Sequence, residues 1–149
     1  MTTATESAAS TRAVPTLTGV HHLGLTVRDI ATSEAFYGKA LGMVRAFVEP
    51  HSTGAGYAVV MMRPGTDLVL GLDYHPDADG AMFDPRRTGL DHLAIRVNDR
   101  ADIDAWVAHL DAVGIEHGQV FSTEEPVPHA LVVFRDPDGL PIELFWLEA

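Results

Sequence analysis

The sequence predicts an α+β fold built from two matching βαβββ modules, and the main observation behind this prediction is an internal repeat. The segment Thr18–Asp29 returns as Thr88–Asp99, so that His22 recurs as His92 70 residues later, and six of the aligned positions are identical. After each copy the pattern of apolar residues changes from a strand to a helix and then to three more strands. A repeat followed twice by the same succession of elements indicates a duplication.

Each module is expected to begin with a half-buried strand and a capped helix. Alternating apolar residues mark the strands, namely Leu23, Leu25 and Val27 in the first copy and Leu93, Ile95 and Val97 in the second. Asp29 and Asp99 stand where a helix would begin, and the helical apolar stripes stop at Gly42 and Gly114. The remaining strands are expected over 43–49, 57–63 and 67–73, then over 115–121, 130–135 and 141–148.

The same reading divides the chain into four segments. Residues 1–16 are rich in Ala, Ser and Thr and are expected to form a disordered tail without the apolar stretch of a secretory signal. Module 1 is expected over 17–74 and module 2 over 89–149. An Asp-, Pro- and Gly-rich linker over 75–88 joins them.

Composition excludes several classes of partner. The net charge of −11 argues against binding to nucleic acid or to anionic membranes. No apolar run approaches the roughly 20 residues that span a bilayer. The absence of cysteine removes disulfides and thiolate ligands and is compatible with a cytoplasmic location.

Strand alternation decides which polar side chains share a surface. If the alternating apolar residues pack on the helices, then His22 and Thr26 in module 1 and His92 and Arg96 in module 2 face the other side of the sheets. In the last strand Glu143 and Phe145 also face away from the helix. Two imidazoles and one carboxylate are a coherent ligand set for one divalent metal ion and leave coordination positions open.

These motifs resemble the vicinal oxygen chelate superfamily, which includes glyoxalases, extradiol dioxygenases and bleomycin resistance proteins. The resemblance covers residues 17–148 and rests on four stretches, which are His22-Leu-Gly-Leu-Thr-Val-Arg-Asp, Phe36-Tyr37 with Leu41-Gly42, His92-Leu-Ala-Ile-Arg-Val, and Asp136-Pro-Asp-Gly-Leu-Pro-Ile-Glu143-Leu. It implies a curved mixed-sheet cleft with helices on the outer face, a glyoxalase/dioxygenase-like fold. It also implies metal ligands at His22, His92 and Glu143.

The fourth ligand position of a glyoxalase I-like site falls on Val69 when the turn before it is aligned with the turn before Glu143. The resemblance therefore implies a three-ligand site, in which Fe(II) is favoured and Mn(II), Ni(II), Zn(II) or Co(II) remain alternatives. The reaction stays open between dioxygenase-like and glyoxalase-, lyase- or isomerase-like chemistry. A metal-free, antibiotic-sequestering protein of the bleomycin resistance kind is the alternative function, and a non-catalytic sensor is a third.

Further roles are expected around the metal. The candidates for substrate binding are Arg96, Thr26 and Phe145, and those for catalysis are Glu143 and His129. A salt bridge between Arg96 and Glu143 is the alternative in which both residues have only a structural role. Relatives of this length commonly build their clefts at a homodimer interface, so His22 can meet His92 and Glu143 of a partner chain. The other histidines (His21, His51, His75, His109 and His117) are expected not to be ligands, and Asp67 and Asp73 to be poor substitutes for a ligand at Val69.

Overall fold

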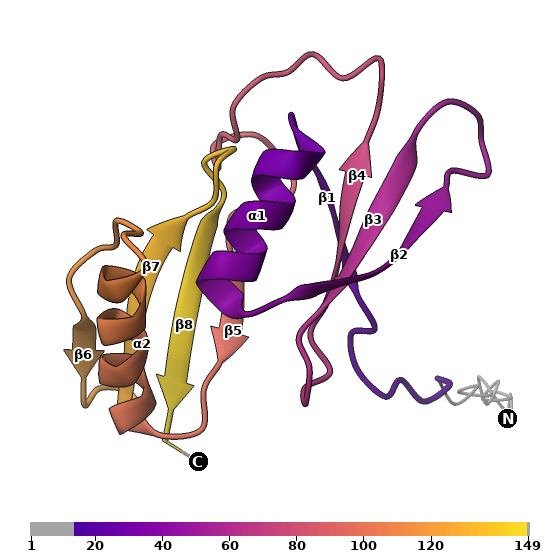
Figure 1. Ribbon diagram of the computed structural model, residues 1–149. Coiled ribbons are helices and arrows are strands. Elements are labelled where there is room, and N and C mark those ends of the chain that lie inside the picture. Colours follow the sequence, from indigo (N-terminus) through magenta and orange to yellow (C-terminus); the bar gives the residue numbers. More distant parts are fainter. Residues whose placement is uncertain (1–13, 149) are drawn as a thin grey trace, which may run out of the picture.

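The computed structural model describes residues 14–148, so most of the tail expected over 1–16 lies outside the described residues. The described chain forms two βαβββ units in succession (Figure 1). The first unit consists of β1 (Leu23–Thr26), α1 (Ile30–Leu41), β2 (Val44–Pro50), β3 (Tyr57–Met62) and β4 (Val69–Tyr74). The second consists of β5 (Leu93–Arg96), α2 (Arg100–Ala112), β6 (Phe121–Thr123), β7 (His129–Arg135) and β8 (Pro141–Leu147). The segment boundaries drawn from the sequence stay a prediction.

Both units have the same sheet topology. One four-stranded sheet has the order β1-β4-β3-β2 and the other has the order β5-β8-β7-β6. In each sheet the first strand pairs in parallel with the last strand, and the other pairs are antiparallel. The sheets are therefore mixed and open, and the predicted α+β fold of paired modules is confirmed.

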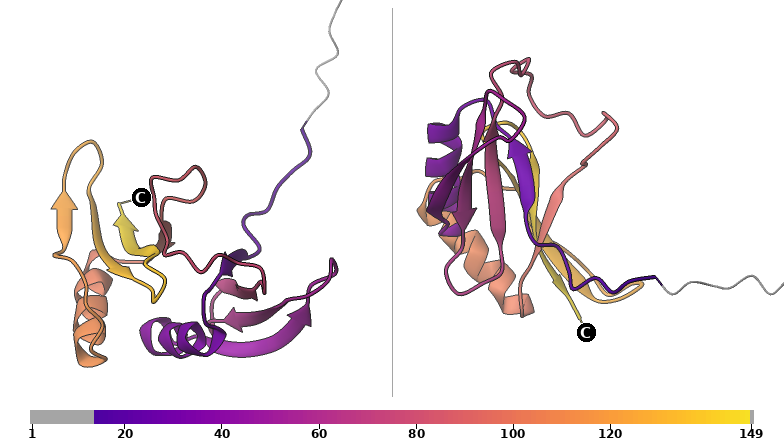
Figure 2. Two further views of the ribbon diagram at one scale, coloured as in Figure 1. Left: turned by 90° about the horizontal axis from the view of Figure 1, so that it is seen from above. Right: turned by 90° about the vertical axis from the view of Figure 1, so that its right-hand side faces the viewer.

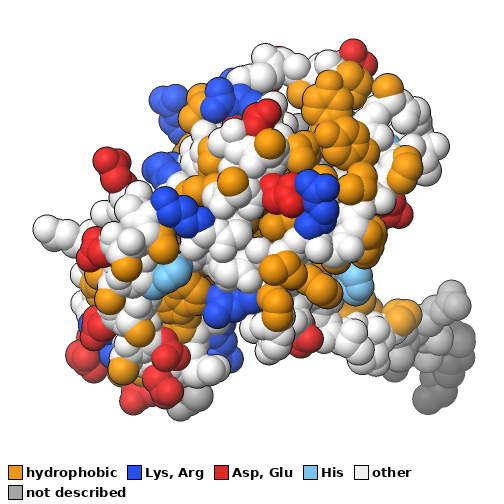
Figure 3. Space-filling view, viewed as in Figure 1, with side chains coloured by type: hydrophobic (Ala, Val, Ile, Leu, Met, Phe, Trp, Pro, Cys, Tyr) orange, Lys and Arg blue, Asp and Glu red, His pale blue; other side chains and the backbone are white. Residues whose placement is uncertain are grey.

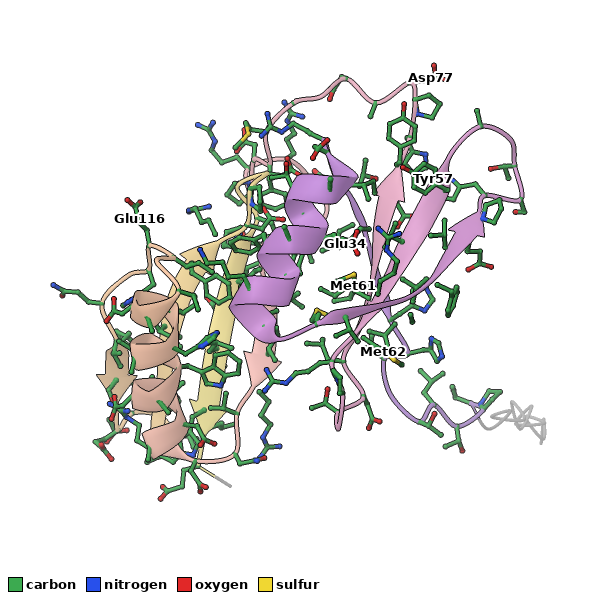
Figure 4. The ribbon with its side chains drawn as sticks, in the orientation of Figure 1. Glu34, Tyr57, Met61, Met62, Asp77 and Glu116 are labelled. Carbon is green, nitrogen blue, oxygen red and sulfur yellow. The ribbon has the colours of Figure 1, made fainter. Side chains whose placement is uncertain are left out.

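Both helices cover the same side of the molecule and leave the other face of each sheet without a helix (Figure 2). The apolar positions of the strands point toward the helices, and the core includes Leu25, Leu72, Ile142 and Leu144. Strand β3 shows the alternation clearly, because Met61 is 1% exposed and its neighbour Met62 is 43% exposed (Figure 4). The helices begin where expected, at the N-cap residues Asp29 and Asp99.

Two buried or half-buried polar contacts join the modules at the turn between β7 and β8. The Tyr37 hydroxyl in α1 donates a hydrogen bond to Oδ2 of Asp136 over 2.9 Å. Arg28, which follows β1, pairs with Asp138 at 2.6 Å. Burial raises the pKa of Asp136 although three hydrogen bonds to its carboxylate oppose the rise, and burial together with the charge of Asp136 raises the pKa of Tyr37.

Two strands differ from their predicted positions. The prediction of a strand over 115–121 was wrong. Strand β6 starts only at Phe121, and the preceding segment pairs with the sheet through one isolated bridge between His117 and Phe134. Strand β4 starts at Val69 rather than at residue 67 because the Arg63 amide bonds the Leu68 carbonyl and keeps the intervening residues in a turn. No helix within residues 14–148 has the length and apolar character needed to cross a membrane.

Candidate metal centre

The helix-free faces of the two sheets carry the polar residues that strand alternation placed there. His22, Gly24 and Thr26 on the β1 side are exposed, as are His92, Ala94 and Arg96 on the β5 side. Gly24 and Ala94 occupy equivalent positions, and neither has a side chain large enough to cover its histidine neighbour. The faces that carry these residues are therefore open to a ligand.

His92 and Glu143 lie together in module 2. Strands β5 and β8 run in parallel with Ala94 opposite Glu143, and this register brings Nε2 of His92 to 3.6 Å from Oε2 of Glu143. The Nδ1 atom of His92 lies 2.7 Å from a carboxylate oxygen of Asp91, which can only accept a hydrogen bond. The proton is therefore held on Nδ1, and the unprotonated Nε2 beside Glu143 keeps a lone pair that can coordinate a metal ion. The hydrogen bond to Asp91, assisted by the charge of Glu143, raises the pKa of His92.

The same arrangement recurs at His22. Its Nδ1 atom lies 2.8 Å from Nδ1 of His21, the residue that stands where module 2 has Asp91. In both modules the side chain before the candidate ligand thus engages Nδ1 and leaves Nε2 available. Sequence reasoning treated His21 only as a residue that does not bind metal, although its alignment with Asp91 in the repeat was a usable signal for a positioning role.

His22 lies apart from the other two candidate ligands. Among residues 14–148, it does not join His92 and Glu143 in a group whose ligand atoms all lie within 4.8 Å of one another. It lines a cleft of about 950 Å³ between the modules, together with Ala94 and Arg96 of β5 and the turn before β4. A single chain therefore brings two of the three candidates together.

The fourth position of the site needs a correction. Leu23 pairs with Leu70 and Gly24 with Gly71, whereas Leu93 pairs with Ile142 and Ala94 with Glu143. The residue of module 1 equivalent to Glu143 is therefore Gly71 and not Val69, because the turn before β4 is longer than the turn before β8. Gly71 has no side chain, so the three-ligand pattern is unchanged.

The other candidate residues are divided between the two sheets, and only Arg96, Phe145 and His129 lie on the module 2 sheet that carries Glu143. Arg96 is paired with Phe145 in the β5–β8 register, and among the described residues it forms no ion pair with Glu143. The His129 ring stacks on the Phe145 ring with centroids 5.5 Å apart, and its Nδ1 lies 2.9 Å from the Val127 carbonyl oxygen. Thr26 lies further away on β1, at a pocket of about 350 Å³ under the segment 78–90.

A second group of possible ligands was missed by sequence reasoning. His51, Asp73 and His75 each offer one ligand atom, and these atoms all lie within 4.8 Å of one another. They come from the end of β2 and the end of β4, which no spacing in the sequence indicated. His109, which was expected only not to be a ligand, contacts the other module, because its Nε2 lies 3.1 and 3.2 Å from the carbonyl oxygens of Lys39 and Ala40.

Comparisons with known proteins agree with this architecture. A model of the Glyoxalase/Bleomycin resistance protein/Dioxygenase superfamily matches residues 19–144. The uncharacterized protein YaeR of Escherichia coli (strain K12) is 32% identical over an alignment of 135 residues, which covers 85% of this chain and 94% of YaeR. The structure of a glyoxylase/bleomycin resistance protein/dioxygenase domain from Frankia sp. EAN1pec superposes with a TM-score of 0.76 at 28% identity and covers 89% of this chain and 94% of that one.

A more distant structure shares the fold alone. It is the fosfomycin resistance protein FosX from Listeria monocytogenes, complexed with Mn(II) and sulfate ion. It superposes with a TM-score of 0.57 at 16% identity, covering 88% of this chain and 93% of that one.

Proposed function

Because this chain belongs to the Glyoxalase/Bleomycin resistance protein/Dioxygenase superfamily, we propose that it is a divalent-metal-dependent enzyme for a small substrate that chelates the metal through neighbouring oxygens. His22, His92 and Glu143 are the proposed metal ligands. The observation that carries this proposal is the position of the His92 Nε2 atom, which faces Glu143 Oε2 at 3.6 Å.

This distance suits two ligands of one ion. Ligand atoms at about 2.1 Å from a metal lie roughly 3.0 to 3.4 Å apart when they occupy neighbouring coordination positions. Only a small movement of either side chain is needed to reach that range. The donors also fit chemically, because neutral imidazole nitrogens and one carboxylate oxygen suit Fe(II), Mn(II), Ni(II), Zn(II) or Co(II).

A bound ion would act as a Lewis acid that stabilises negative charge on the substrate oxygens. Around it, Arg96 supplies a fixed positive charge two residue pairs along the sheet from Glu143, and Phe145, the strand partner of Arg96, supplies an apolar surface. His129, whose ring stacks on Phe145, is the proposed acid/base group that exchanges a proton with a bound substrate. Thr26 is proposed as a further substrate contact from module 1.

The separation of His22 from the other two ligands supports a shared site. We propose that the protein forms a homodimer in which His22 of one protomer completes the site built on His92 and Glu143 of its partner. The exposed helix-free faces of both sheets leave the required surface uncovered in a single chain.

Gly71 narrows the reaction class. A glyoxalase I-like site with four protein ligands would need a side-chain donor at this position, and glycine supplies none. Three ligands favour dioxygenase-like chemistry, or lyase or isomerase chemistry in which the substrate fills more positions. The fosfomycin resistance protein FosX shows that a distantly similar fold accommodates Mn(II). The alternative function is metal-free sequestration of an antibiotic.

The metal content of the purified protein tests the proposal. Protein purified without chelator is expected to hold more metal in the wild type than in His92→Ala, by one ion per chain. Fe(II), Mn(II), Ni(II) or Zn(II) should raise the melting temperature of metal-stripped wild type more than that of the variant. Equal metal content and equal thermal shifts in the two proteins would contradict the enzyme proposal and favour the sequestering function.

Subunit mixing tests the shared site. His22→Ala and Glu143→Ala each remove one ligand, but a mixed dimer would rebuild one complete site from the intact His22 of one chain and the intact Glu143 of the other. We therefore expect the metal ion of this site to be bound again when the two variants are unfolded together and refolded, and not when each is refolded alone. Binding that stays lost in the mixture would place all ligands within one chain.

A further inference from the structure

A second cluster of metal-ligating side chains lies at the far end of the module 1 sheet, where the mechanism proposed above uses none of them. We propose that His51, Asp73 and His75 form a separate binding site for a divalent transition metal ion. This site is independent of the proposed function, since its residues differ from the ligands His22, His92 and Glu143.

The geometry of the cluster suits one ion. Nε2 of His51 lies 2.9 Å from Oδ1 of Asp73, and the rings of His51 and His75 have centroids 4.6 Å apart. One ligand atom from each residue lies within 4.8 Å of the other two. Two atoms already as close as His51 Nε2 and Asp73 Oδ1 match neighbouring ligands of a metal, and only His75 has to move inward.

The position of the cluster follows from the strand register. Asp73 pairs with Ala58 and Thr26, and the last residue of β2 is followed directly by His51. His51 and Asp73 are therefore on the helix-free face, and their side chains are 17% and 22% exposed. His75 follows β4 and is exposed, so an ion can enter from solvent on its side.

Glycines around the cluster keep space for these side chains. A Cβ atom on Gly56 would lie 2.7 Å from Nδ1 of His51, and one on Gly24 or Gly71 would lie 3.0 or 3.2 Å from Oδ2 of Asp73. Any other residue at Gly56 would push the His51 ring out of place. The backbone of three separate strands and turns is thus shaped to hold the imidazole and the carboxylate together.

The cluster is distinct from the centre proposed around His92 and Glu143. Those residues belong to module 2, and the candidate ligand of module 1, His22, lies four residues before Thr26, the β1 partner of Asp73. Four residues of strand span about 13 Å, which is too far for His22 and Asp73 to share a single ion. Figure 4 shows the end of the sheet concerned, where Tyr57 projects from β3 and Asp77 lies beyond β4.

The donor set predicts the class of metal. Two imidazoles and a carboxylate favour Zn(II), Ni(II) or Co(II) over Mg(II) and Ca(II), which prefer oxygen ligands. Three protein ligands leave a position for water on the exposed side. The net charge of −11 further favours accumulation of cations at the protein surface.

Equilibrium dialysis of full-length, chelator-stripped protein against Zn(II) tests the site. The wild type is expected to bind two ions per chain, and His75→Gln and His92→Ala one each. Because His75 is exposed, His75→Gln should leave the fold intact, which circular dichroism checks. His117→Gln is the matched control, because it removes an imidazole that belongs to neither cluster, and it should still bind two ions. The affinity of the affected site in His75→Gln should fall more than about 10-fold.

The outcomes separate the two sites. If all Zn(II) binding is lost in His92→Ala and none in His75→Gln, the second site is overturned while the proposed function stands. If binding is lost in His75→Gln and unchanged in His92→Ala, the second site is supported and the proposed function fails. Mg(II) competing as well as Ni(II) for the ion lost in His75→Gln would also overturn the assignment.

Discussion

Replacing Tyr37 with phenylalanine removes one hydroxyl from the junction between the modules and should destabilise the protein measurably. The Tyr37 side chain is 0% exposed, and its hydroxyl donates to Oδ2 of Asp136, which is itself 7% exposed. Phenylalanine keeps the ring, so no large cavity forms. The substitution leaves a buried carboxylate oxygen without this donor, and a hydrogen bond to a charged group contributes about 1.5–3 kcal/mol.

Urea unfolding followed by circular dichroism measures this effect. We expect a lower midpoint and an unchanged slope with denaturant, because the surface exposed on unfolding stays the same. For a chain of this size, about 1.5–3 kcal/mol corresponds to a fall in melting temperature of roughly 3–12 °C. A loss of stability below about 0.5 kcal/mol would refute the view that this hydrogen bond holds the modules together.

The effect should also depend on pH in a defined direction. Burial raises the pKa of Asp136 in the folded protein, so ionisation of this group costs stability as the pH rises through that raised value. The Tyr37 hydroxyl offsets part of the cost because it stabilises the ionised form. The penalty of Tyr37→Phe is therefore expected to be full above the raised pKa and to shrink below it. Asp136→Asn is the matched control, since in its background Tyr37→Phe should show little pH dependence.

Three further outcomes are expected. Gly56→Ala should destabilise the protein more than Gly54→Ala, since both residues have φ near +130° but only at Gly56 would the added Cβ meet a backbone atom, the Tyr74 carbonyl oxygen at 2.6 Å. The conformation alone costs about 1–3 kcal/mol, so thermal melts that rank the two variants equally would contradict the close contact. Asp91→Asn should weaken metal binding about 10- to 100-fold through loss of the carboxylate that orients His92, and unchanged affinity in a chelator competition would remove Asp91 from that role. Metal affinity should fall as the pH is lowered through the raised pKa of His92, because protons then compete with the metal for Nε2. Calorimetric titrations at several pH values measure this affinity, and an affinity that does not change over that pH range would contradict His92 as a ligand.

Much of the fold was predictable because the duplication repeats the same pattern of apolar residues in both modules. The alternation around Leu25 and Leu144 correctly placed the core side of the strands, and both are buried. The segment 115–121 misled because its apolar residues pack beside the sheet without forming a ladder. The fourth site position was misplaced by two residues, from Gly71 to Val69, because turn length and not turn composition determines strand register.

The candidate site was predictable only in part. Strand alternation could place His92 and Glu143 on one face, and the structure puts their ligand atoms 3.6 Å apart. The contact between His51 and Asp73 could not be predicted from the sequence, because it depends on how far β2 extends and on how β2 aligns with β4 through β3. Figure 3 shows hydrophobic side chains gathered at the surface of module 1. The exposed rings of Tyr57 and Tyr74 lie 5.4 Å apart.

The junction at Asp136 breaks the symmetry that the duplication created. In the turn before β8, Asp136 accepts a hydrogen bond from the Tyr37 hydroxyl. In the turn before β4 the contact is of another kind, because the Arg63 guanidinium lies over the Trp106 ring at 4.9 Å from its centroid. The two halves therefore carry unlike and complementary joining surfaces. If the chain were cut within the segment 75–88, each half would have to select the other half and not a copy of itself, so fragment complementation should yield mixed pairs. Exchange of one module for a second copy of the other would lose both sets of contacts.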